Sequence, residues 1–333
     1  MHNSVSQSSA TSRRSILSVL AGSFGVTAAA TASRAMALPL PPVAPATVWR
    51  LTADPSSTTF GNGVTIPFFR YNTNGTRRGA LPFAQATEGS SLTVLVTNNL
   101  PHAFRPEIVG VATGPLIRPG TSASFSFNMP PAGTYLLSAD GGKTAPAPGN
   151  FGAAHISRPT NGLSGTLVSR PSSGAQVLYD GGPAYDREYV LLYDDADDRR
   201  NALQGSLGSI PRQPYEANYF TLNGMGFPDI AGDTDSVVAA GLGERVLLRL
   251  GNLGRTRQCI HFHGFHADTA TRDNLPEIHW GEKDTIPVPT RTTTDVLFTA
   301  NQLGTYPLHP HNVQAVTADG AYPFGQLTLI VVS

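Results

Sequence analysis

Two histidine pairs are the residues of this chain whose types and spacing point most directly to chemistry. His261 and His263 lie two positions apart, and so do His309 and His311. Residues i and i+2 of a β-strand project from the same face, so each pair presents two imidazoles on one side. Neutral imidazole binds copper, zinc, iron and nickel, and two adjacent strands would bring four nitrogen donors together. The spacing therefore predicts a metal site at these four residues.

Chance alone does not account well for two such pairs. With nine histidines in 333 residues, random placement gives about a quarter of one His-x-His pair. The competing interpretation is a set of ordinary hydrogen-bonded histidines. Cys259, the only cysteine of the chain, shares strand parity with the first pair. Because buried free cysteine is common and inert, we expect Cys259 to pack in the core.

The elements that would carry the histidines are short β-strands. The chain has 34 glycines and 27 prolines, and from Thr47 onward runs rich in Val, Leu, Thr and Phe alternate with Gly, Pro and Asn. This pattern is typical of an all-β sandwich or barrel. In 243–254, Arg245 and Arg249 alternate with apolar residues, which predicts a half-buried strand. The clearest predicted strands span 91–101, 121–130, 133–140, 187–195, 243–254, 292–300, 304–311 and 324–332.

The two halves of the chain resemble each other. EGSSLTVLVTNNL in the first half parallels LGERVLLRLGNLG in the second, and PPAGTYLLSAD parallels NQLGTYPLHPH. Similar segments in the same order indicate a duplicated β-domain. We therefore expect domains at 47–172 and 185–333, divided near the Ser- and Gly-rich segment 170–176.

The N-terminus predicts export. Arg13 and Arg14 precede a mildly apolar run, and Ala35-Met36-Ala37 gives a small-x-small cleavage pattern. Residues 1–37 resemble a twin-arginine signal peptide, which implies a periplasmic or secreted protein. No later stretch is apolar enough for a membrane span. Lys plus Arg equals Asp plus Glu at 23 each, so no basic surface is expected to bind nucleic acid.

A family resemblance rests on an ordered set of motifs. IHFHGF, GEKDTIPVP and GTYPLHPHNVQ resemble the last domain of multicopper oxidases, the laccase-like and nitrite-reductase-like family built from cupredoxin domains. FFRYNTNG, TVLVTNNLP, IRPGTSASFSF, AGTYLLSAD and NGLSGTLVSRP look like the landmarks of a first such domain. The resemblance covers nearly all of the chain after the signal peptide. It implies two cupredoxin-like Greek-key β-sandwich domains, with copper as the metal.

Carried over residue by residue, the resemblance is incomplete. It makes His261 a type-2 copper ligand, and His263, His309 and His311 type-3 or interdomain ligands. The blue type-1 centre needs a thiolate and two imidazoles, but its positions hold Gln258, Pro310 and Ala315. Laccase-type blue-copper chemistry is therefore not expected.

The first domain lacks the matching ligands as well. The family's His-x-His-Gly aligns with residues 107–110, which begin with Glu107, and the second pair aligns with Ser138 and Asp140. His155 or His102 would restore at most one ligand there. We expect His266 and His279 to be exposed or to lie behind the ligands.

Three functions remain open on the sequence. The first is binding of one or two copper ions by the four histidines, with an oxidoreductase or copper-handling role on a small-molecule or metal substrate; two-domain relatives imply a homotrimer. The second is a metal-free periplasmic scaffold or binding protein on the same fold. The third is a mixed site in which Glu107 or Asp140 joins the histidines, suited to zinc, iron or manganese.

Overall fold

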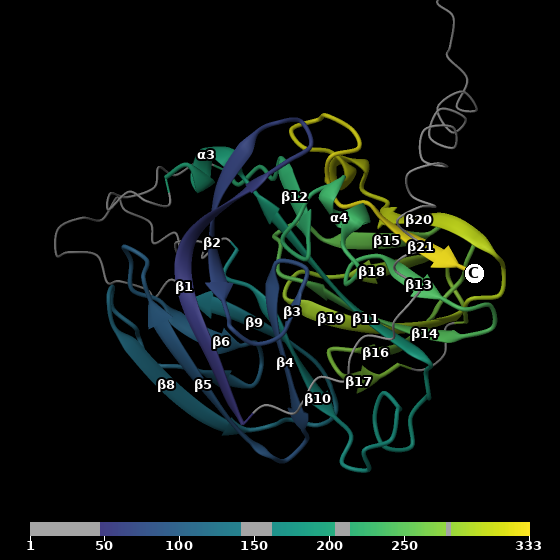
Figure 1. The fold of residues 1–333 in the computed structure, drawn as a ribbon, viewed down its shortest axis with the longest axis horizontal. Helices are drawn as coiled ribbons and strands as arrows, with labels where there is room; N and C mark the ends of the chain where they lie inside the picture. The colour runs from purple at the N-terminus through teal and green to yellow at the C-terminus, as the bar shows by residue number, and fades with distance from the viewer. Residues whose placement is uncertain (1–46, 141–161, 204–213, 278–280) are drawn as a thin grey trace, which may run out of the picture. The chain divides into compact units, whose positions relative to one another are not determined.

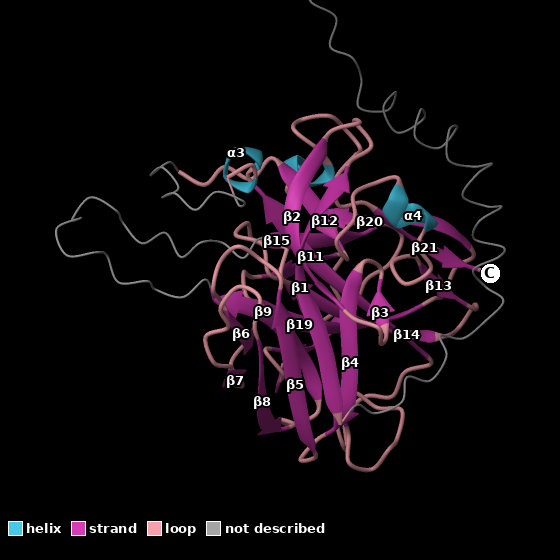
Figure 2. Cartoon of the chain, turned by 60° about the vertical axis from the view of Figure 1, so that its left-hand side comes forward, coloured by secondary structure: helices cyan, strands magenta, loops and turns pink. Residues whose placement is uncertain are grey.

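The chain is built almost entirely of strands. This computed structural model describes residues 47–140, 162–203, 214–277 and 281–333. Strands dominate the cartoon in Figure 2, and the described helices are single turns. The expected all-β class is confirmed. The expected signal peptide at 1–37, together with His155 and His279, lies outside the described residues.

Two sheets occupy the first half of the described chain. A four-stranded sheet has the order β2-β1-β5-β8, and a six-stranded sheet has the order β3-β4-β10-β9-β6-β7. We call these two sheets the first sandwich. Their strands are β1 (Val48–Thr59), β2 (Thr65–Asn72), β3 (Arg77–Arg78), β4 (Leu81–Thr87), β5 (Ser91–Asn98), β6 (Arg105–Ile108), β7 (Ala112–Thr113), β8 (Ser122–Asn128), β9 (Gly133–Asp140) and β10 (Gly165–Arg170).

Two further sheets follow and form the second sandwich. Their orders are β12-β11-β14-β19-β16-β17 and β13-β21-β20-β15-β18. The strands are β11 (Arg187–Ala196), β12 (Tyr219–Leu222), β13 (Val238–Ala240), β14 (Arg245–Asn252), β15 (Gln258–Phe262), β16 (Asp268–Arg272), β17 (Leu275–Pro276), β18 (Thr285–Val288), β19 (Thr292–Thr299), β20 (Gly304–Pro310) and β21 (Thr328–Val332). Single helical turns are α3 (Asp198–Asn201), α4 (Asp229–Gly232) and the 3-10 turn η1 (Val313–Val316).

The strand order repeats between the two sandwiches. In the first, β5 pairs in parallel with β1 and antiparallel with β8; in the second, β14 pairs in parallel with β11 and antiparallel with β19. The row β4-β10-β9-β6 likewise matches β13-β21-β20-β15. Among them, β5 resembles β14 in sequence and β9 resembles β20. Because Leu40–Ser333 group into one compact unit, the domain limits 47–172 and 185–333 stay a prediction.

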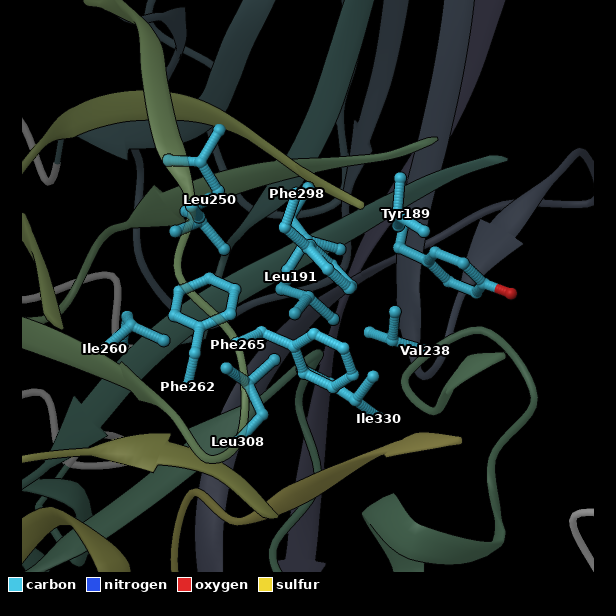
Figure 3. Packing of buried hydrophobic residues seen from close by; sticks show 14 of the residues in the cluster. Tyr189, Leu191, Val238, Leu250, Ile260, Phe262, Phe265, Phe298, Leu308 and Ile330 are labelled. Carbon is cyan, nitrogen blue, oxygen red and sulfur yellow. The ribbon is translucent and has the colours of Figure 1, made fainter. Parts of the chain in front are cut away.

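Each sandwich has its own apolar core. The second core gathers side chains from both sheets, and Figure 3 shows Ile260, Phe262 and Leu308 packed among residues such as Leu250 and Phe298. Ile260 and Phe262 are on β15 and Leu308 is on β20, so one face of each of these strands is buried. In a period-two strand, the intervening residues must then lie on the opposite face.

The prediction of a half-buried strand at 243–254 is wrong for Arg249. This side chain is fully buried, because the outward face of β14 is covered by β9 of the first sandwich. The guanidinium pairs with Glu188, and its Nη1 donates to the hydroxyl of Thr134 at 2.9 Å. Thr134 in turn donates to Asp295 at 2.7 Å. The alternation predicted that Arg249 would face solvent; instead it faces polar groups of the first sandwich and of its own sheet.

Within the described residues, no helix is long and apolar enough to cross a membrane.

A Thr134→Val substitution tests the contact between the sandwiches. Thr134 is 1% exposed, and its hydroxyl bonds two ionisable groups. Losing a buried hydrogen bond to a charged group costs about 1.5–3 kcal/mol, so we expect a loss of that size in urea unfolding. Thr93→Val is the matched control, because its hydroxyl bond to Ser126 is exposed and should contribute less than about 0.5 kcal/mol. Equal effects of the two substitutions would contradict the assignment.

Asp194 should make stability fall as pH rises. Burial in the first place, and the Asp195 carboxylate in the second, raise the pKa of Asp194 to about 7. An unfolded aspartate has a pKa of about 3.9, so between pH 4 and 7 the unfolded chain loses a proton that the folded chain keeps. The contribution of Asp194 to the free energy of unfolding is fully present below pH 4 and is lost as the pH rises through 7. The loss amounts to about 4 kcal/mol, at 1.36 kcal/mol per pKa unit.

Asp194→Asn checks this dependence, because asparagine keeps the oxygen that accepts the Asp195 amide at 2.9 Å. Urea unfolding at pH 5 and pH 8 should show a smaller decline in the variant than in the original chain. Parallel declines in the two proteins would show that Asp194 does not titrate in this range.

Candidate metal centre

The two histidine pairs lie on neighbouring strands. β15 and β20 are antiparallel, with Ile260 opposite Pro310 and His261 opposite His309. The alternation of β15 buries Ile260 and Phe262, so His261 projects from the other face. His263 follows the strand and stays paired, because its N–H donates to the carbonyl of Pro307 at 3.1 Å. We call the surface formed by His261, His263, His309 and His311 the histidine face.

A glycine fixes where the first pair ends. Gly264 has a φ of +79°, a conformation that residues with a Cβ rarely adopt. A Cβ at this position would also lie 2.7 Å from the ring of Tyr306. The chain can therefore turn away from β20 immediately after His263.

The four imidazoles converge. The His261 ring centroid lies 4.7 Å from His263, 4.7 Å from His311 and 5.8 Å from His309. The centroids of His263 and His309 are 5.0 Å apart, and their Nε2 atoms are separated by 2.9 Å. The strand ends thus face the same direction, as the spacing of the residues predicted.

Hydrogen bonds orient two of the rings. His261 Nδ1 lies 3.0 Å from the carbonyl oxygen of Asp284 and 3.1 Å from the hydroxyl of Thr285, and His309 Nδ1 lies 2.9 Å from the carbonyl of Pro310. A carbonyl can only accept, so both Nδ1 atoms carry a proton, and in the neutral form of each ring Nε2 keeps the lone pair. A hydrogen bond from Nδ1 to an oxygen behind the ring is the arrangement that prepares histidine as a metal ligand.

Partial burial and neighbouring imidazoles keep two of the rings, His263 and His309, neutral. Burial first, and then the neighbouring imidazoles of His309, His261 and His311, lower the pKa of His263 to about 4. Burial also lowers the pKa of His309. Metals bind the neutral form of imidazole, so neither ring has to lose an imidazolium proton to bind a metal near pH 7.

Four imidazole nitrogens suit a transition metal, although the four do not surround a common point in this structure. Adjacent nitrogen ligands at about 2.0–2.1 Å from one ion lie about 3 Å apart, which matches the contact between His263 and His309. Among the described His, Cys, Asp and Glu side chains, no three are placed to hold an ion as they stand. The rings of His261 and His311 would have to turn toward the pair.

Cys259 is not in the core, so that expectation is wrong. Its exposure is intermediate and its thiol is free. The parity of β15 puts it on the same face as His261, because the buried positions are Gln258, Ile260 and Phe262. Because Gln258 and Ile260 on either side of Cys259 point inward, Cys259 must point outward, whatever the general tendency of cysteine to be buried.

Two of the three positions that match a blue copper centre, Gln258 and Pro310, lie on the opposite, buried face of the sheet, and Ala315 lies in η1. Gln258, Pro310 and Ala315 are all buried. Within the part of the chain that the structure describes, the amide nitrogen and oxygen of Gln258 have no hydrogen-bond partner, and the same holds for Asn312. Buried amides are weak metal donors compared with thiolate and imidazole, so the lack of a blue centre stays the prediction for this chain.

The equivalent place in the first sandwich has different side chains. There Glu107 of β6 lies opposite Ser138 of β9, as His261 lies opposite His309 in the second sandwich. The Glu107 carboxylate accepts a bond from Arg291 Nη2 at 2.8 Å. An ion pair thus occupies the oxygen donor that a mixed carboxylate and imidazole site would use.

Two other histidines have described positions, His102 and His266, and neither has a described ring contact with the four histidines. The ring of His102 packs edge-on against Phe69 of the first sandwich, 6.3 Å between centroids. His266 is exposed, in agreement with its predicted place outside the ligand set.

Sequence reasoning missed the groups behind His261. Asp284 and Thr285 belong to the motif GEKDTIPVP, but only the pairing of Thr285 with His261 across β18 and β15 reveals their role. A carboxylate oxygen of Asp284 also approaches His261 Nδ1 to 3.8 Å. The Asp-Thr dipeptide next to a strand was the available signal, and it was too short to assign alone.

Comparison with known proteins supports the resemblance. Residues 203–324 match the family model of multicopper oxidases. No curated protein is similar enough to be matched. A blue copper oxidase from Nitrosomonas europaea is 20% identical, with a TM-score of 0.66 and coverage of 86% of this chain and 85% of that one.

Two further solved structures have the same fold. A copper nitrite reductase from Nitrosomonas europaea is 16% identical with a TM-score of 0.63, covering 86% of this chain and 93% of that one. A laccase from Botrytis aclada is 17% identical with a TM-score of 0.59, covering 88% and 53%. The matched segment 203–324 includes all four histidines, and the chain shares the cupredoxin-like fold of the multicopper oxidases and the copper nitrite reductase.

Proposed function

We propose that this protein binds copper through His261, His263, His309 and His311, as an exported protein with an oxidoreductase or copper-handling role. The observation that carries the proposal is the convergence of four imidazoles on one face, with two Nε2 atoms 2.9 Å apart. One or two ions would fit such a set. Zinc, iron or manganese would meet the same imidazoles, but the family match favours copper.

Some residues would hold the copper ion, and others orient the ligand rings. The Nε2 atoms of His263 and His309 form the fixed pair, while Asp284 and Thr285 hold the His261 ring from behind. Bound copper would supply one-electron redox chemistry. His311 is exposed, so it lies where a small-molecule or metal substrate would approach from solvent.

A second candidate function is a metal-free scaffold. It is favoured by the direct contact of His263 with His309: if His263 donates from Nε2, the lone pair of His309 is satisfied without a metal. In this case the histidine face would be a polar patch of a binding protein. Copper titration separates the two candidates, because a scaffold needs no ion.

Export and assembly belong to the same proposal. The twin-arginine pattern at 1–37 would direct the folded chain to the periplasm or the outside of the cell. There a homotrimer would place the histidine face of one subunit against its neighbour, as the family resemblance implies. A small-molecule or metal substrate remains the proposed partner.

Replacing His309 and His311 together by alanine should abolish copper binding. The original chain should bind between one and two equivalents of Cu(II), measured by elemental analysis after dialysis. The double variant should retain less than half an equivalent, because half the imidazoles are gone. His266→Ala is the matched control, since this histidine is exposed and not part of the histidine face, and the substitution should leave the stoichiometry unchanged. Unaltered binding by the double variant would refute the assignment of these ligands.

Thr285→Val tests the orientation of His261. The substitution removes the hydroxyl 3.1 Å from Nδ1 while keeping the branched shape of the side chain. Loss of a group behind a ligand typically lowers metal affinity about 10- to 100-fold; since the Asp284 carbonyl remains, we expect the lower end of that range. Competition with a chelator measures the affinity, and a Cu(II) dissociation constant equal to that of the original chain would rule out this role.

A further inference from the structure

The histidine face continues by one residue at its β15 end. Cys259 precedes His261 by two positions, and the burial pattern of β15 places both on the face away from the core. The thiol is free and partly exposed. A sulfur donor therefore borders the four imidazoles on the side facing away from the core.

The cross-strand neighbour of Cys259 is His311. The N–H of His311 donates to the carbonyl of Cys259 at 2.7 Å, one step beyond the pairing of Ile260 with Pro310. Directly opposed residues of antiparallel strands have Cβ atoms about 4.5–5.5 Å apart. The His311 ring in turn lies 4.7 Å from the His261 ring. Cys259, His311 and His261 thus occupy three adjoining places of one surface.

We propose that Cys259, His261 and His311 form a site for a soft, monovalent metal ion, with Cu(I) as its natural occupant. This inference deepens the proposed function, because it rests on the same histidine face and adds a ligand to it. Thiolate donors select Cu(I) over harder ions, and imidazole suits copper in either oxidation state. The site is on the opposite side of the sheet from Gln258 and Pro310, so it does not rebuild the blue centre.

No three of the described His, Cys, Asp and Glu side chains are placed to hold an ion as they stand, so the Cys259 thiol and the His311 ring would turn toward His261 on binding. Cysteine has one side-chain torsion, and His311 is exposed directly after β20. The ring of His261 is held at Nδ1, which leaves its Nε2 directed away from Asp284 and Thr285. Binding breaks the S–H bond of Cys259 and forms an S–Cu bond, and the proton passes to solvent. No electron is transferred in this step.

The His263 and His309 pair would remain available beside this site. Its two Nε2 atoms already contact each other, whereas Cys259 lies next to His311, at the opposite end of the histidine face. A soft donor set and an imidazole pair on one surface would favour reduced copper at one end and oxidised copper at the other. The protein would then hold copper in both oxidation states, which suits a copper-handling role.

Titration of the reduced, full-length protein with Cu(I) under anaerobic conditions, against a competing Cu(I) chelator, tests the proposal. Changing groups that only support a ligand costs about 10- to 100-fold in affinity, so Cys259→Ser should lose at least about tenfold. His266→Ala is the matched control, because this exposed histidine is not part of the histidine face, and it should change Cu(I) affinity by less than about threefold, within ordinary context effects. X-ray absorption of the Cu(I) form should show one sulfur in the original chain and none in Cys259→Ser.

The outcomes separate this inference from the proposed function. If Cys259→Ser binds Cu(I) as tightly as the original chain, or no sulfur contacts the ion, the thiolate site is overturned while Cu(II) binding by the histidines can stand. If the original chain binds neither ion, both proposals fail. Urea unfolding of each variant shows whether it folds, and slower alkylation of Cys259 in the Cu(I)-loaded original chain gives an independent check that needs no variant.

Discussion

The candidate site depends on one constraint, the register between β15 and β20. Because side chains alternate along a strand, the packing of Ile260, Phe262 and Leu308 in the core requires His261 and His309 to project outward. A slip of one residue would bury the imidazoles and expose the core residues. The apolar core of the second sandwich therefore selects the arrangement of the metal donors.

The two sandwiches use the same strand order for different chemistry. At the equivalent place, the second sandwich gathers imidazoles, and the first sandwich carries Glu107 in an ion pair with Arg291. Partial burial is what keeps His263 neutral, whereas a guanidinium neutralises the carboxylate of Glu107. The duplicated architecture thus keeps one potential metal face and turns the other into a polar contact.

The sequence predicted much of the fold because each strand carries a local signal. Alternation and turn residues identified β5, β9, β11, β14, β19 and β20, and the His-x-His spacing identified the histidine face. Contacts between sheets were not predictable in this way. Arg249 is buried because β9 covers it, and Cys259 is partly exposed because its neighbours Gln258 and Ile260 point inward. The support of His261 by Thr285 depends on strand pairing, which composition does not encode.

The electron paramagnetic resonance spectrum of the Cu(II)-loaded, full-length protein tests the central claim most directly, because coupling to ring nitrogens counts the imidazoles around the ion. Convergence of the histidine face on copper predicts coupling to at least two imidazole nitrogens in a single dominant species. A spectrum of hydrated or heterogeneous copper, without nitrogen coupling, would contradict the account and leave a cupredoxin-like fold without a metal site at these residues.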